Sequence, residues 1–147
     1  MPRIVLDFEP PNADAPQLAG DTSDLAYFLS WAFSARYGGN HEMSVASLIL
    51  RGEFKIDLRP LLTFADREVE TEADADMLEK AWQEPGPLAD CCDRVVQAFD
   101  SGEKRLSALT EEYPDLVRQI GELGQIARWA ANAGLRIRVT FSMEPLT

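Results

Sequence analysis

Hydrophobic and polar residues alternate along several short segments of the chain, a period of two that is typical of β-strands with one buried face. The alternation is cleanest over residues 135–143, where nine residues follow it without exception. In a second region, Arg51-Gly52 separates two β-rich segments and predicts the turn of a hairpin. The four predicted strands are residues 3–8, 44–50, 53–59 and 135–143.

Two single helices are predicted from apolar residues that recur at spacings of three and four. In the first, Tyr27 and Trp31 widen the apolar face, so we expect this helix to be largely buried and Trp31 to lie in the core, as we do for Trp129 further along. Its other inward positions are Leu25, Phe28, Leu29, Ala32 and Phe33. The second helix covers residues 72–83. Its expected inward positions include Ala73, Met77 and Ala81.

From Leu88 to Ala130, apolar residues are spaced alternately by four and three positions, a rhythm that is typical of helices packed on one another. Pro114 would break a continuous helix, because proline removes a backbone hydrogen bond and clashes with the preceding turn. We therefore expect one helix over residues 88–109, which can bend at Ser101-Gly102, and another over residues 114–132.

These two helices are expected to pair antiparallel within one chain, and Gly121 and Gly124 would let them approach closely. The alternative is a coiled coil between chains, which would give a homodimer through helices 88–132. The elements together predict an α+β fold with two layers: an approximately four-stranded, mostly antiparallel sheet with helices packed on one face. The terminal strands would lie side by side. The open face would carry Arg3, Asp7, Lys55, Asp57, Arg59, Arg136, Arg138 and Thr140.

A length of 147 residues and an average content of hydrophobic residues indicate a single globular domain over 1–147. The three lysines and eleven arginines are scattered, which disfavours binding to nucleic acid or to an anionic membrane. No apolar stretch is long enough to span a bilayer, and the N-terminal apolar run is too short for a signal peptide. We therefore expect a cytoplasmic protein.

The acidic residues are concentrated in one part of the sequence. Between Asp66 and Asp93 there are ten acidic and two basic residues, which account for −8 of the formal net charge of −11. One interpretation is a solvated helix that keeps the protein soluble. The other is a docking surface for a basic partner protein, which negative potential would steer into contact. The candidate contact residues are Glu68, Glu70, Glu72, Asp74, Asp76 and Glu79, with Trp82 as an aromatic anchor.

Motifs for catalysis or for cofactor binding are missing from the sequence. It contains no phosphate-binding glycine loop, no dinucleotide fingerprint and no nucleophile elbow. The acidic residues that begin at Asp66 or Asp74 do not fit a calcium loop, and one histidine cannot build a multi-histidine metal site. The adjacent Cys91 and Cys92 are expected to be free thiols in or beside a helix core. We predict no metal, no cofactor and no catalytic residue.

The leading hypothesis is a non-catalytic interaction or regulatory module that presents an acidic helical surface to a basic partner. The alternative is a small-ligand binder or an enzyme, with a pocket near Tyr37, His41 and Glu42. The sequence leaves open whether His41 or the two adjacent cysteines have a function.

Overall fold

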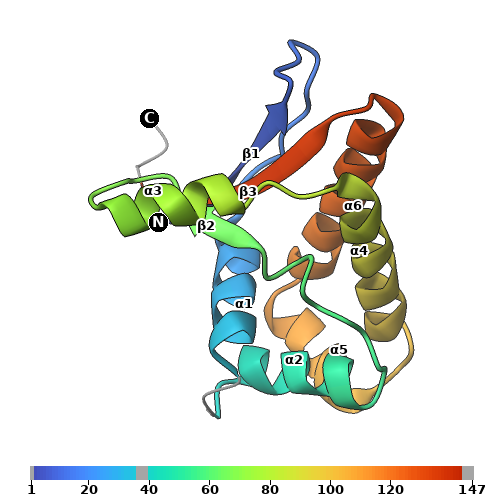
Figure 1. Ribbon diagram of the computed structural model, residues 1–147. Coiled ribbons are helices and arrows are strands. Elements are labelled where there is room, and N and C mark those ends of the chain that lie inside the picture. The colour runs from blue at the N-terminus through green and yellow to red at the C-terminus, as the bar shows by residue number, and fades with distance from the viewer. Residues whose placement is uncertain (1, 36–39, 144–147) are drawn as a thin grey trace.

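The computed structural model describes residues 2–35 and 40–143, and this part of the chain has an α+β fold (Figure 1). Within it there are three strands and six helices. The strands are β1 (Arg3–Glu9), β2 (Phe64–Asp66) and β3 (Arg136–Ser142). The helices are α1 (Ser23–Ser34), α2 (Glu42–Gly52), α3 (Glu72–Lys80), α4 (Pro85–Phe99), α5 (Lys104–Glu112) and α6 (Leu116–Asn132). None of these helices in the described residues combines the length and apolarity needed to cross a membrane.

The sheet is mixed and has the strand order β1-β3-β2. β1 and β3 are antiparallel neighbours, with Arg3 opposite Ser142 and Glu9 opposite Arg136. β2 lies parallel to β3 on the other side. The prediction that the terminal strands are adjacent is therefore confirmed, as is the α+β class. The expected four-stranded, mostly antiparallel sheet is wrong, because the described residues form a three-stranded mixed sheet.

In place of the predicted hairpin over residues 44–59, the chain forms α2 and an irregular segment. His41 caps this helix, because its Nδ1 accepts a hydrogen bond from the backbone N–H of Met43 at 3.1 Å. The buried positions of α2 then recur at helical spacing: Met43, Ala46, Ile49 and Leu50. Residues 53–59 do alternate between buried and exposed side chains, but in the described structure no strand pairs with them. Alternation predicts a strand only where a neighbour completes the backbone hydrogen bonds.

Helices α1 and α6 cover the apolar face of the sheet (Figure 1). That face consists of Ile4, Leu6 and Phe8 from β1 and Ile137, Val139 and Phe141 from β3. Phe8 meets Trp129 of α6 edge to face, with ring centroids 5.6 Å apart. Trp129 is therefore packed against the core, as predicted.

The heptad-like seam is buried between α4 and α6, which run in opposite directions (Figure 1). Their close contact lies at Gly124, where an added Cβ would stand 2.9 Å from the Cβ of Cys92. The intrachain pairing and the role of Gly124 are confirmed. The predicted helix over residues 88–109 is instead two helices, because Gly102 adopts a positive φ of 87° between α4 and α5. A homodimer would need another surface, because this seam is already buried.

The other face of the sheet is polar. Asp7 of β1 pairs with Arg138 of β3 at 3.0 Å, and Glu9 pairs with Arg136. Arg138 also donates a hydrogen bond to the carbonyl oxygen of Leu78 at 3.2 Å, which attaches the end of α3 to the sheet. The predicted positions of Asp7, Arg136 and Arg138 on this polar face are confirmed. The expected contribution of Lys55, Asp57 and Arg59 to this face is wrong, because these residues lie outside the sheet.

Candidate functional site

The acidic helix α3 is stabilised by a local cap at its N-terminus. The hydroxyl of Thr71 accepts a hydrogen bond from the backbone N–H of Asp74 at 3.2 Å, and the Asp74 carboxylate accepts one from the Thr71 N–H at 3.1 Å. The backbone N–H of Glu70 also donates to Asp74, and this bond is the main reason why the pKa of Asp74 is lowered. The carboxylate that closes the cap is therefore held in its charged form.

α3 extends away from the helical body of the molecule (Figure 1), and none of its residues is buried. Ala73 and Met77, which were expected to face inward, are exposed, and 58% of Met77 is accessible. The buried residue at this end is Ala81, which follows the helix. The inward positions were mispredicted because the helix reaches past the layer that would have covered them.

The six predicted carboxylates on and before α3 have no close ion-pair partner in the part of the chain that the structure describes. We call this set the acidic surface; it consists of Glu68, Glu70, Glu72, Asp74, Asp76 and Glu79. Five of them are exposed, and Asp74 is half-buried. Within residues 2–35 and 40–143, none of the six forms an ion pair within 4.0 Å. Their negative potential therefore extends into solvent.

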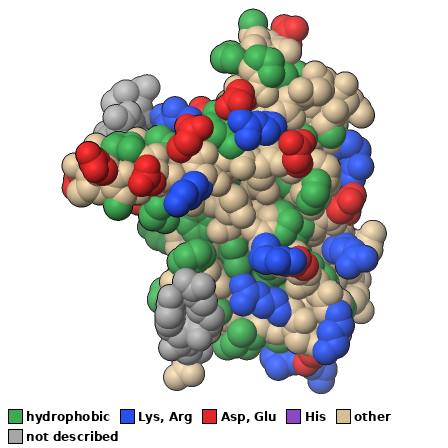
Figure 2. Space-filling view, viewed as in Figure 1, with side chains coloured by type: hydrophobic (Ala, Val, Ile, Leu, Met, Phe, Trp, Pro, Cys, Tyr) green, Lys and Arg blue, Asp and Glu red, His purple; other side chains and the backbone are tan. Residues whose placement is uncertain are grey.

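The nearest arginine in the sequence pairs with an acid outside the acidic surface. Arg67 Nη1 lies 2.8 Å from Asp7 Oδ2 on the polar face of the sheet. Figure 2 shows acidic side chains along α3, whereas lysines and arginines gather mainly at the opposite end of this face, around α2 and α5. Toward the end of the acidic segment between Asp66 and Asp93, the negative charge is partly balanced, because Asp93 pairs with Arg128 at 2.6 Å. In the folded protein, the unpaired negative charge is thus concentrated on and before α3, which is a smaller region than the acidic segment of the sequence.

A hollow of about 600 Å³ lies within the acidic surface. It is lined by Asp66, Glu68, Glu70, Asp74 and Met143. Glu68 accepts a hydrogen bond from the backbone N–H of Met143 at 3.1 Å, so the segment before α3 is tied to the end of β3. A cationic group in this hollow would meet several carboxylates together.

Trp82, the predicted aromatic anchor, is half-buried after the end of α3. The guanidinium of Arg138 lies 4.4 Å from the centre of its ring, and that of Arg136 lies 5.7 Å from it. These distances are typical of cation–π contacts, which hold Trp82 against the polar face of the sheet. Contact between Trp82 and a partner stays a prediction.

Sequence reasoning missed two aromatic residues on α1 that lie at the surface. Tyr27 and Trp31 were expected in the core, but they are 45% and 39% exposed. The core positions of this helix are instead Leu25, Phe28, Leu29 and Ala32, and Phe33 is also partly exposed. The signal was present in the sequence, because an apolar face that wraps so far around a helix exceeds what one sheet can cover.

The alternative site was placed near Tyr37, His41 and Glu42, and Tyr37 lies outside the described residues. His41 caps α2 and stacks on Trp31, with ring centroids 4.1 Å apart. Glu42 accepts a hydrogen bond from the Tyr113 hydroxyl at 3.0 Å. Five cavities in the described part of the chain, of about 370 to 600 Å³, are lined by residues other than His41 and Glu42. The geometry around His41 and Glu42 is that of a contact between helices.

Cys91 and Cys92 are buried free thiols on α4, as predicted. Burial raises the pKa of Cys91 to about 11, and the Cys91 Sγ donates a hydrogen bond to the carbonyl oxygen of Asp57 at 3.4 Å. Burial also raises the pKa of Cys92 well above its usual value. Since the thiolate is the reactive form, neither side chain is prepared as a nucleophile at neutral pH.

Among the described residues, no group of three or more His, Cys, Asp or Glu side chains is placed to hold a metal ion. No protein-family model, curated protein or solved structure matches this chain.

Proposed function

We propose that this protein is a non-catalytic interaction module that presents the acidic surface to a basic partner protein. The observation that carries the proposal is the set of six carboxylates on and before α3, which have no ion pair among the described residues. Surface acids that serve stability alone are often balanced by nearby bases, as Glu103 is by Arg105 elsewhere on this molecule.

The acidic surface has two properties that favour recognition. Its six carboxylates have no ion pair among the described residues, so their potential would accelerate encounter with a basic surface over about a Debye length, roughly 8 Å at physiological ionic strength. Its helix is fixed by the cap at Thr71 and Asp74 and by the contact of Leu78 with Arg138. The carboxylates are therefore arranged in advance and need little ordering on contact.

The test compares two variants of equal net charge. In the first, Glu70→Gln, Glu72→Gln and Asp76→Asn neutralise three exposed residues of the acidic surface and leave the Asp74 cap intact. In the control, Asp14→Asn, Asp100→Asn and Glu111→Gln neutralise three exposed acids elsewhere. Each tagged protein captures basic proteins from a lysate of its native host at low and at high salt, and mass spectrometry quantifies what is retained.

We expect the first variant to retain its most enriched basic protein at least tenfold less than wild type, and with a weaker dependence on salt. The control should retain that protein at close to the wild-type level. If the two variants lose capture equally, the attraction is one of net charge alone and the proposed docking surface is wrong. If neither loses capture, the acidic surface does not bind the partner.

A further inference from the structure

An apolar hollow of about 490 Å³ lies between α1 and the end of β3. Its wall on α1 is formed by residues at positions i, i+3, i+4 and i+7, which lie on one face of the helix. The remaining lining comes from Phe141 of β3, from Met143 just after this strand, and from Pro2 and Asp66; the residues on α1 are Tyr27, Ser30, Trp31 and Ser34. A hollow of this size is within the range of about 300–1,000 Å³ that is usual for ligand pockets.

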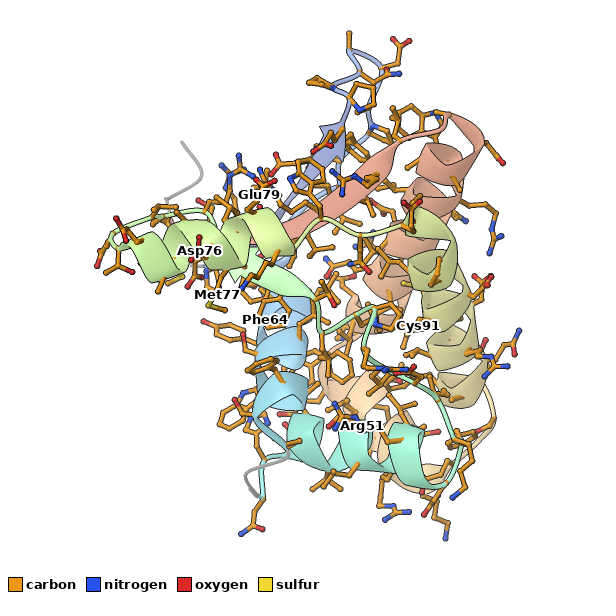
Figure 3. All side chains as sticks on the ribbon, viewed as in Figure 1. Arg51, Phe64, Asp76, Met77, Glu79 and Cys91 are labelled. Atoms are coloured by element: carbon orange, nitrogen blue, oxygen red, sulfur yellow. The ribbon has the colours of Figure 1, made fainter. Side chains whose placement is uncertain are left out.

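The aromatic residues of this hollow are held in place by their neighbours. Trp31 stacks on His41 with an angle of 4° between the rings, and His41 is itself fixed as the cap of α2. Phe141 stacks on Phe64 with ring centroids 4.5 Å apart. Figure 3 shows Met77 near Phe64, on the side of α3 that faces α1. The hollow is therefore preformed, which lowers the entropy that a ligand loses on binding.

The apolar hollow adjoins the carboxylate-lined hollow described above. Asp66 and Met143 line both, so the two hollows are neighbours, and we call the pair, with its aromatic part and its acidic part, the depression. The exposed apolar side chains at this boundary include Met143, which is 59% accessible. A single segment of a partner can reach both parts without bending around the protein.

We infer that this depression binds a basic peptide segment of a partner protein, with a large apolar side chain in the aromatic part and Arg or Lys in the acidic part. The inference rests on the proposed function and names the chemistry of the partner. Charge complementarity selects this occupant, because a positive segment is attracted by Asp66, Glu68 and Glu70. A second copy of the chain, with its own net charge of −11, would bring acid against acid. Phosphate-bearing ligands meet the same repulsion.

The test begins with selection from a displayed library of random twelve-residue peptides, with the full chain as bait. We expect enriched peptides to carry Trp, Phe, Leu or Met within about four positions of Arg or Lys, the reach of one helical turn. An enriched peptide is then labelled, and its affinity is measured by fluorescence polarisation. Failure to enrich any peptide, or enrichment without basic residues, overturns the inference.

Two single variants of equal exposure locate the binding. Tyr27→Ala removes a wall of the aromatic part, and we expect it to weaken the labelled peptide at least tenfold. Leu48→Ala is the control, because Leu48 of α2 is also 45% exposed but does not line the depression. The control should bind within twofold of wild type. Equal binding by wild type and Tyr27→Ala overturns the inference.

The two proposals fail in distinguishable ways. If Tyr27→Ala binds normally while the Glu70, Glu72 and Asp76 variant loses the peptide, the acidic surface binds partners without the aromatic part, so the inference fails and the proposed function stands. If neither variant changes binding, both fail. Sedimentation that shows self-association of wild type, abolished by Tyr27→Ala, makes a second copy the occupant and also overturns the inference.

Discussion

Arg67 is paired with Asp7 across the polar face of the sheet, with 2.8 Å between Nη1 and Oδ2. The same carboxylate oxygen lies 3.0 Å from Arg138 Nη2, so one acid serves two guanidinium groups. Arg67 also donates a hydrogen bond to the Thr140 hydroxyl at 2.9 Å. This arrangement joins the segment before α3 to both long strands.

Asp7→Ala should destabilise the fold, because it leaves Arg67 and Arg138 without their shared acceptor. Both Asp7 and Arg138 are mostly covered, with side chains 21% and 16% exposed. Loss of a charged partner at such a site costs about 1–3 kcal/mol of unfolding free energy, which urea denaturation can measure. Asp57→Ala is the control, because its pair with Arg59 is far more exposed and should contribute little. Equal losses for both variants would contradict this account.

Gly124→Ala should destabilise the pairing of α4 with α6. The new Cβ would stand 2.9 Å from the Cβ of Cys92, a distance that requires the helices to separate. Overpacking costs about 1–3 kcal/mol, and the helix preference of alanine offsets about 1 kcal/mol of it. Gly121→Ala meets Val96 at an ordinary 3.8 Å and should instead stabilise the protein. Chemical denaturation of the two variants tests the difference in sign, and stabilisation by both would show that the contact at Gly124 is not tight.

Glu112→Gln should make stability less dependent on pH. The pKa of Glu112 is raised, mainly because its side chain shares a hydrogen bond with Glu42. A raised carboxyl pKa means that the native state favours the protonated side chain. The stability that this side chain contributes is therefore fully present below the ordinary Glu pKa of about 4.3, and it is lost as pH rises through the raised pKa. Glutamine keeps a neutral hydrogen-bonding group throughout. The Tm of the variant should match wild type near pH 4 and exceed it near pH 7.

The control for this pH dependence is Glu111→Gln, which changes the neighbouring exposed acid. Thermal unfolding followed by circular dichroism should show that the Tm difference between this control and wild type is the same near pH 4 and near pH 7. A Tm difference between wild type and Glu112→Gln that stays constant with pH would mean that Glu42 and Glu112 do not share a proton.

Sequence patterns predicted well those elements whose pattern directly reflects the neighbour that covers them. β3 alternates because helices cover one of its faces and the other face is polar, and the seam of α4 and α6 repeats because each helix covers the other. α2 was mistaken for a strand because Leu48, Ile49 and Leu50 are consecutive, although Leu48 is exposed and the other two face the core. A run of three apolar residues does not distinguish the two periods.

The acidic half of the candidate site could be read from the sequence, because six of its residues lie within twelve positions. The aromatic half could not, because it joins residues of α1 to Phe141 and Met143, which are more than a hundred positions away. The α1 residues lie close to Phe141 and Met143 only because β1 pairs antiparallel with β3 and α1 packs against the sheet. An aromatic at helical spacing otherwise belongs in a core, which is why Trp31 was misplaced.

Because α3 has no buried residue, the side chains of this charged tip of the molecule can change without changing the stability of the fold. Substitutions along residues 72–80 would leave the packed interior intact as long as the Thr71 and Asp74 cap remains. Such a tip is suited to rapid divergence, since a new binding preference would not require compensating changes in the interior. The same independence makes it a practical place to graft a foreign helical epitope.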